Sequence, residues 1–272
     1  MAEQRTLPEY DQPPVIETLL GVQFDPIERF SILHFGVYWT GIKSDYPSYE
    51  LQPPLGSLVE KFGEEAWKKP GVRLELLHAP EVRCWFTDKS GTRLIQVQRD
   101  RFIHNWRKVK DEDVYPRYAQ IKPKFFDEWE GLNRFLEQAD LGKPEVNQCE
   151  VTYVNHIEMG KAWASFGELN KVISCWSGSY SGDFLPGPES VLVNASFVIP
   201  GQRGRLHVAL QRAIRTRDAK EVLQLTLTAR GKPASSRSQD IAEWFDLGHE
   251  WIVRGFTDLT TKEMHKTWGR KL

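Results

Sequence analysis

Alternating polar and apolar side chains run through residues 92–108 and limit this segment to paired β-strands. The segment reads TRLIQVQRDRFIHNWRK, and the alternation holds on both sides of residues 99–100. A period of two is what a strand with two unlike faces produces. We therefore predict a β-hairpin that turns at residues 99–100, although neither residue is the glycine that the tightest hairpin turns prefer.

Polar side chains gather on this hairpin, which otherwise reads as core. Gln98, Arg101, Asn105 and Arg107 lie close together along it, and a guanidinium fork suits carboxylate and phosphate groups. The last three share one parity, so we expect them to face one concavity, with Gln98 at its rim. The competing interpretation is a solvated sheet face on which arginine stems cover aromatic rings.

Two residues of other predicted strands complete the candidate ligand-binding set. Glu17 interrupts an apolar strand, and a buried carboxylate needs a partner, which Arg101 or Arg107 could supply. Asn155 lies near the end of the strand predicted over residues 146–157. We expect Glu17 or Asn155 to orient the guanidinium groups and leave their remaining donors for an anion.

Composition indicates a well-packed protein, in which any electrostatic partner must be bound locally. The chain has 272 residues, enough for one large domain or two fused halves, and 40% are hydrophobic. Lys+Arg is 36 and Asp+Glu 37, so no overall field of one sign indicates nucleic acid or a membrane. Cys84, Cys149 and Cys175 form no CxxC pair, which fits a reducing compartment. The polar start has no signal-peptide core and no run reaches membrane length, so we expect a cytoplasmic protein.

The element order predicts two similar halves after a polar arm at residues 1–14. The first half, residues 15–142, should hold a strand, a helix starting at Asp25-Pro26 with Phe30, Leu33 and Val37 on its apolar side, and a loop at 45–54. A short helix at 55–62, strands at 72–77 and 82–86, the hairpin and a long helix from Tyr115 should follow.

The second half, residues 143–272, repeats this order. We predict a strand at 146–157, a helix at 166–175, strands at 191–199, 205–214 and 221–229, and a closing helix capped by Ser236 with Gln239. The fold class is therefore α+β, with two pseudo-duplicated halves that each run strand, helix, antiparallel strands, long helix. Helix-on-sheet halves of this kind occur in TATA-binding-protein-like and helix-grip folds.

Familiar catalytic signatures are missing from the sequence. It contains no GxxxxGK[ST], GxGxxG, GxSxG or HExxH, and its seven histidines have no metal-ligand spacing, so we predict neither a metal nor another cofactor. His156 and Glu150 are the candidates for a general base. The alternative for His156, a strand-end histidine hydrogen-bonded to the backbone, is the commoner case.

Three motifs resemble a sporadically distributed bacterial family without an assigned activity. They are Pro-Pro-Val-Ile-Glu at 13–17, Gln98-x-x-Arg101-Phe102-x-x-Asn105-Trp106-Arg107, and Tyr153-x-Asn155-x-Ile157. The resemblance implies a shared fold and a prokaryotic cytosolic setting, and brings no catalytic residues. The patchy distribution of the family suggests an accessory role, such as phage defence or a toxin–antitoxin-like partnership.

Three functional hypotheses follow. The first is a non-enzymatic binding protein that holds an anionic ligand or a protein partner on its polar sheet face. The second is a hydrolase or transferase that acts on a phosphorylated or nucleotide-like substrate, with His156 or Glu150 as base. The third is an interaction subunit that presents aromatic side chains to another protein. A closed pocket around His156 and an arginine would favour the enzyme.

Overall fold

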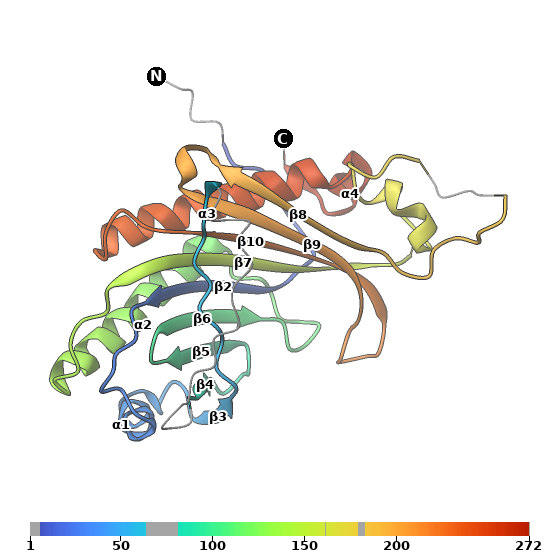
Figure 1. The fold of residues 1–272 in the computed structure, drawn as a ribbon. Coiled ribbons are helices and arrows are strands. Elements are labelled where there is room, and N and C mark those ends of the chain that lie inside the picture. Colours follow the sequence, from blue (N-terminus) through green and yellow to red (C-terminus); the bar gives the residue numbers. More distant parts are fainter. Residues whose placement is uncertain (1–5, 64–80, 161, 179–182, 272) are drawn as a thin grey trace.

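The computed structural model describes residues 6–63, 81–160, 162–178 and 183–271. These residues form an antiparallel sheet in the order β3-β4-β5-β6-β2-β7-β10-β9-β8, with two long helices on one face (Figure 1). The α+β class with helices packed on an antiparallel sheet is thus confirmed. The strands are β2 (Val15–Phe24), β3 (Ser48–Gln52), β4 (Arg83–Thr87), β5 (Arg93–Gln98), β6 (Arg101–Arg107), β7 (Val146–Glu158), β8 (Leu192–Ile199), β9 (Gly204–Ile214) and β10 (Glu221–Gly231).

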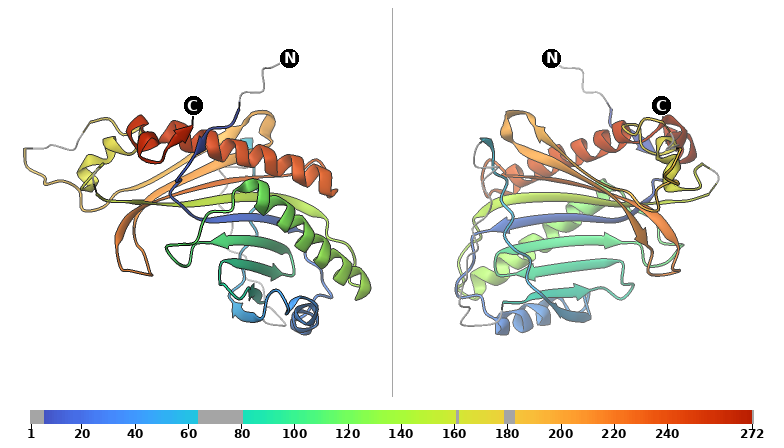
Figure 2. Two further views of the ribbon diagram at one scale, coloured as in Figure 1. Left: turned by 180° about the vertical axis from the view of Figure 1, so that it is seen from behind. Right: turned by 45° about the vertical axis from the view of Figure 1, so that its right-hand side comes forward.

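The two long helices α2 (Tyr118–Gln138) and α3 (Ser238–Leu259) lie side by side on the same face, as the view from behind in Figure 2 shows. The shorter helices are α1 (Ile32–Ile42) and α4 (Lys262–Thr267), with 3₁₀ turns η2 (Phe166–Lys171) and η3 (Pro200–Gln202). Strand β1 (Glu9–Tyr10) pairs with β11 (Arg270–Lys271) and fixes the N-terminal arm near the C-terminal end.

Aromatic side chains fill the space between the sheet and the helices. The ring of Trp129 on α2 lies 5.7 Å from that of Phe24 and 5.6 Å from that of Phe102, between centroids. Trp244 on α3 donates its indole N–H to the carbonyl oxygen of Arg203 at 3.0 Å. Both tryptophans are buried, so each anchors its helix to the sheet.

The predicted hairpin is confirmed. Gln98 pairs with Arg101 across the turn, and β5 and β6 stay in register as far as Arg93 and Trp106. The strands predicted over residues 146–157, 191–199, 205–214 and 221–229 also form, with ends shifted by at most two residues.

Several local predictions for the first half are wrong. Helix α1 starts only after Ser31, whose backbone N–H donates to His34 Nδ1, so the Asp25-Pro26 signal does not open it. Two of its predicted core residues, Leu33 and Val37, are exposed, and Phe35 and Tyr38 are buried instead. Phe35 and Tyr38 are three residues apart and share the buried side of the helix, where Tyr38 packs against Phe86 and Phe135.

Other segments also differ from their predicted conformation. The predicted loop at 45–54 contains β3, residues 55–62 form no helix, and the helix predicted at 166–175 is only the 3₁₀ turn η2. Helix α3 begins after Arg237 without the predicted side-chain cap. The strand predicted at 72–77 falls outside the described residues.

The two predicted halves share the sheet. Strands β2 and β7 pair antiparallel at its centre, and the remaining strands of each half lie outward from them. The order is strand, α1, four strands and α2 in the first half, and strand, η2, three strands and α3 in the second. Whether this reflects a duplication stays a prediction, because only the element order supports it.

Candidate functional site

A ten-residue segment crosses the sheet face that lies opposite α2 and α3. We call residues 53–62 the strap. It leaves β3 at one edge and runs across the strands toward the other edge (Figure 1). Because its residues adopt no regular structure, their backbone groups need partners from elsewhere.

Glutamine side chains of the sheet provide many of these partners. Gln98 Oε1 accepts from the Leu55 backbone N–H at 2.8 Å, and Gln98 Nε2 donates back to the Leu55 carbonyl oxygen at 3.0 Å. Gln23 accepts from the Leu58 N–H at 3.0 Å and donates to Ser57 Oγ at 3.0 Å. These amides therefore bind the strap as a neighbouring strand would.

A buried carboxylate fastens the far end of the strap. Glu60 pairs with Arg205 and His207, and its Oε1 lies 3.7 Å from Arg230 Nη1. Burial alone would raise the pKa of Glu60, but the hydrogen bonds and charges of His207 and Arg205 outweigh it and lower that pKa. Glu60 is thus held as an anion under ordinary conditions.

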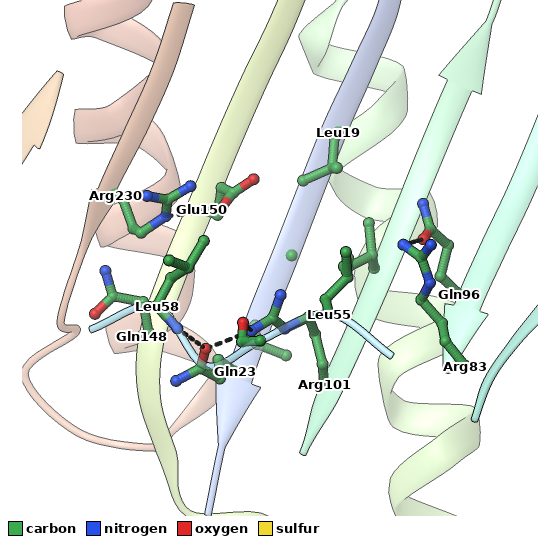
Figure 3. A pocket seen from close by; sticks show the side chains of 14 residues that line it. Leu19, Gln23, Leu55, Leu58, Arg83, Gln96, Arg101, Gln148, Glu150 and Arg230 are labelled. Atoms are coloured by element: carbon green, nitrogen blue, oxygen red, sulfur yellow. Dashed lines mark hydrogen bonds and ion pairs between the residues drawn. The ribbon is translucent and has the colours of Figure 1, made fainter. Parts of the chain in front are cut away.

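Between the strap and the sheet lies a cavity of about 390 Å³, which we call the strap cavity (Figure 3). Its volume falls in the range of small-molecule sites, roughly 300–1,000 Å³. The lining residues come from the strap and six strands: Leu19, Gly21, Val22, Gln23, Leu55, Gly56, Leu58, Arg83, Gln96, Arg101, Ile103, Gln148, Glu150 and Arg230.

Arg101 is the most deeply buried cation of this cavity, with 8% of its surface exposed. Its Nη2 donates to Gln23 Oε1 at 2.6 Å and to the Gly56 carbonyl oxygen at 2.9 Å, while Nε is buried without a partner. Burial lowers the pKa of Arg101, and the charges of Asp100 and Glu150 oppose that effect. A buried guanidinium with unused donors costs free energy unless an acceptor joins it.

Two further lining residues also carry unused donors. Arg83 Nε and Gln148 Nε2 are buried without partners, and together with Arg101 Nε they make up three of the six such side-chain atoms in the described part of the chain. Burial and the charge of Arg101 lower the pKa of Arg83, so the two cations are close enough to repel each other. An anion between them would relieve that repulsion and accept from the unused donors.

Part of the strap cavity lining is apolar, beside further polar groups on Gln96, Glu150 and Arg230. Leu19 and Ile103 come from the sheet, and Leu55 and Leu58 come from the strap. Gly21 keeps the floor open, since a Cβ there would stand 3.2 Å from Ile103 Cγ1. The cavity thus offers an apolar surface beside its cationic groups.

The structure places the predicted residues in different environments. Arg101, Asn105 and Arg107 share one face, and the register pairs Glu17 with Arg107. However, Arg107 Nε donates to the Gly91 carbonyl oxygen at 2.8 Å and Arg107 does not line the strap cavity. Gln98 binds the strap, so its amide is occupied.

The predicted ion pair between Glu17 and an arginine is wrong. Glu17 Oε1 accepts from Asn105 Nδ2 at 2.6 Å, and Asn105 Oδ1 accepts from Gln96 at 2.7 Å. Burial raises the pKa of Glu17, while the Asn105 hydrogen bond and the charge of Arg107 lower it. Asn105 reaches the carboxylate diagonally, because it lies on the same face of the adjacent strand, two residues from Arg107, which pairs with Glu17.

The predicted role of Asn155 beside the arginines is also wrong, because the side chain faces the helices. It donates to the Leu225 carbonyl oxygen at 3.0 Å and lines a different cavity. The two candidate bases do not meet either. His156 contacts Gln224 Oε1 at 3.2 Å, whereas Glu150 accepts from Arg230 at 2.8 Å. They lie six residues apart along β7, about 20 Å in a strand.

Sequence reasoning missed Gln23, Arg83, Gln148, Arg230 and the strap. Gln23 and Gln148 each place a polar amide in a strand predicted to belong to the core. This polar interruption is the sequence feature that could have marked them as site residues. The strap itself has no such signal, because its contacts are made largely by backbone atoms.

Comparison of the chain with family models, curated proteins and solved structures gives no match. The resemblance to a sporadic bacterial family accordingly stays a prediction. Within the described residues, no three His, Cys, Asp or Glu side chains are grouped as metal ligands. Helices long and apolar enough to cross a membrane are likewise absent from that part of the chain.

Proposed function

We propose that this protein is a non-enzymatic binding protein whose strap cavity holds a small anionic ligand with an apolar portion. The observation that carries the proposal is the burial of Arg101 with an unused Nε donor, next to Arg83 and Gln148, which also have unused donors. A carboxylate or phosphate would accept from these groups. The apolar portion would lie against Leu19 and Ile103.

A catalytic function has less support. The hydrolase or transferase hypothesis needs a base beside the bound anion, yet His156 is not among the residues that line the strap cavity. Glu150 does line it, but its carboxylate accepts from Arg230 and Thr152. A carboxylate held by two donors is a weak base, so binding without chemistry fits these contacts better.

The test is mass spectrometry of small molecules released when the purified full-length protein is denatured. We expect a single anionic species at about one per chain. Arg101→Lys keeps the charge but loses the planar fork and should reduce its occupancy at least severalfold. Arg107→Lys is the matched control, because Arg107 is on the same strand and face but outside the cavity.

Two results would contradict the proposal. One is a wild-type protein that releases no anionic molecule and takes up none from a panel of short-chain carboxylates and phosphate esters. The other is an Arg101→Lys variant that folds and retains as much ligand as Arg107→Lys does. Loss of folding in Arg101→Lys alone would favour the structural interpretation of the arginines, in which they only brace the strap.

A further inference from the structure

A second cavity lies on the opposite face of the sheet, beside the N-terminal arm. It has a volume of about 460 Å³, and we call it the arm cavity. The arm passes over α3 before it enters β2 (Figure 2). The walls come from the arm, β2, β7, α3 and the start of α2: Leu7, Pro8, Glu9, Tyr10, Pro13, Val15, Tyr115, Arg117, Tyr118, Ala119, Tyr153, Asn155, His249, Ile252, Val253, Phe256 and Lys271.

Aromatic rings dominate these walls, and their hydroxyl groups are already paired. Tyr115 donates to the Tyr153 hydroxyl oxygen at 2.8 Å, and the hydroxyls of Tyr10 and Thr257 are 2.9 Å apart. Tyr118 donates to Asp246 at 2.8 Å. The tyrosines therefore have little hydrogen-bonding capacity left, and what they offer a ligand is ring surface.

His249 is a polar side chain of the arm cavity whose two ring nitrogens are both unused in the described part of the chain. Its ring stacks on that of Tyr118 with centroids 3.9 Å apart and an interplanar angle of 9°. Among the described residues, neither of its nitrogens makes a hydrogen bond. Burial lowers the pKa of His249 to about 4. The charge of Asp246 opposes this shift, and the charge of Lys122 adds to it. The neutral imidazole thus provides one donor and one acceptor.

Charged lining groups are engaged around the arm rather than inside the cavity. Arg117 donates to the Asp11 carbonyl oxygen at 3.0 Å, and Lys271 Nζ lies 3.7 Å from Glu9 and 3.3 Å from Asp11. A charged ligand would lose its hydration without gaining a buried counter-ion. The cavity therefore selects for a neutral molecule.

We propose that the arm cavity is a second ligand site, which takes an uncharged aromatic molecule of one or two fused rings whose polar group hydrogen-bonds to His249. The ring would lie against Tyr115, Tyr153 and Phe256. This site does not depend on the proposed function, because it is on the other side of the sheet and shares no lining residue with the strap cavity.

The arm forms one wall of the site, so binding should also hold the arm in place. The backbone N–H groups of Asp11 and Gln12 donate to the carbonyl oxygens of Gly269 and Trp268, both at 3.0 Å. A ligand that contacts the arm and α3 together opposes the opening of these bonds. Slower hydrogen exchange at Asp11 and Gln12 is therefore a second readout of binding.

The test is isothermal titration of the full-length protein with 2-naphthol, a neutral bicyclic probe. We expect saturable binding at one per chain, which Val253→Phe removes by filling the cavity from α3. Ala119→Trp should block the same space from an exposed position, where folding is not at risk. Leu247→Phe is the matched control, because it enlarges a half-buried α3 side chain outside the lining.

The role of His249 is tested separately with His249→Phe, which keeps a stacked ring but has no nitrogen. It should bind 2-naphthol about 5- to 10-fold more weakly, as expected for one hydrogen bond, and leave naphthalene binding unchanged. The proposal is overturned if the wild-type protein does not bind 2-naphthol saturably, if both filling variants still bind it, or if 2-naphthoate binds as tightly. Equal 2-naphthol affinity in His249→Phe would overturn the assignment of the polar contact.

Discussion

Gly231 lies where a strand, a turn and a helix come too close for any side chain. A Cβ at this position would stand 2.2 Å from the Arg203 carbonyl oxygen and 2.9 Å from Trp244 Cζ2. Because backbone cannot move aside as a flexible side chain does, Gly231→Ala should lower the free energy of unfolding by about 3 kcal/mol or more, measured by chemical denaturation.

The matched control is Gly36→Ala, in the exposed part of α1, where an added Cβ meets nothing within 4 Å. Alanine has the higher helix propensity, so this variant should gain about 0.5–1 kcal/mol. A loss at Gly231 below about 0.5 kcal/mol, the range of ordinary surface substitutions, would contradict the close approach.

His249 should make the folded state sensitive to acid. Burial lowers the pKa of its imidazole from 6.5 to about 4. The unfolded chain keeps the ordinary pKa, so the contribution of the neutral ring is complete above about pH 6.5 and is lost as the pH falls toward 4. Between pH 6.5 and 4 the wild type should therefore lose on the order of 3 kcal/mol more of its free energy of unfolding than His249→Phe loses.

The relevant measurement is the difference in free energy of unfolding between wild type and His249→Phe. Other groups titrate in the same range, but their contributions are common to both proteins and cancel. Denaturation curves at several pH values between 4 and 7 give it directly. If the curves of wild type and His249→Phe stay parallel, His249 binds its proton equally well in both states.

Strand parity predicted which residues of β6 share a face, but not what they contact. Arg101, Asn105 and Arg107 do lie on one face. Their partners are a strap carbonyl oxygen, Glu17 and a turn carbonyl oxygen, respectively. Carbonyl oxygens have no sequence signature, so these partners could not be predicted. The alternation along β7 puts Asn155 on the same face as the buried Val151 and Tyr153, so the sequence did carry a signal for its face.

At the scale of single elements, each long helix carries one buried tryptophan. Trp129 is 3% exposed on α2 and Trp244 is 2% exposed on α3. Replacing either with Ala removes an indole from a packed interior and should cost roughly 3–5 kcal/mol in chemical denaturation. Trp251→Ala, at a half-buried position of α3, is the comparison and should cost less. Equal losses at all three positions would show that burial does not set the cost.

The strap should loosen when its far anchor is neutralised. Glu60→Gln keeps the shape of the side chain but cannot pair with Arg205 and His207 as an anion, and it leaves the largely buried Arg205 without this counter-charge. We expect the backbone amides of Leu55 and Leu58 to exchange hydrogen at least about 5-fold faster, corresponding to 1 kcal/mol or more.

Strand β2 provides an internal reference, because its amides should exchange as in the wild type. Glu221→Gln is the matched control for charge. Its partner Arg212 is 37% exposed in its side chain, and an exposed ion pair contributes little. Unchanged exchange at Leu55 and Leu58 in Glu60→Gln would mean that Gln98 and Gln23 hold the strap without the carboxylate.

Element prediction succeeded where periodicity was long and failed where local signals were short. The strands of the second half and α2 have hydrophobic patterns that repeat over many residues, and these elements form close to their predicted positions. By contrast, Asp25-Pro26 carries a strong helix-start signal in a segment where Ile27 N–H bonds to the Arg99 carbonyl oxygen of the hairpin turn. A contact between residues so far apart in sequence outweighs local propensity.

For the whole molecule, the central pairing of β2 with β7 predicts a single cooperative transition. Strand β2 of the first half pairs with β7 of the second, so neither half can unfold without exposing the interior of the other. Tryptophan fluorescence and far-ultraviolet circular dichroism should therefore give coincident midpoints in denaturant. Trp129→Ala should shift both midpoints together, although the substitution lies in the first half. Separate transitions would indicate two independent domains.

The central position of β2 also has a consequence for synthesis. Strand β2 ends at Phe24, but its partner β7 spans Val146–Glu158. A ribosome adding 5–20 residues per second needs on the order of 10 s to reach that partner. During this time one edge of β2 has no strand beside it, and an open edge can pair with the same edge of another nascent chain. The strand that joins the finished sheet is thus the one most exposed to aggregation while the chain is being made.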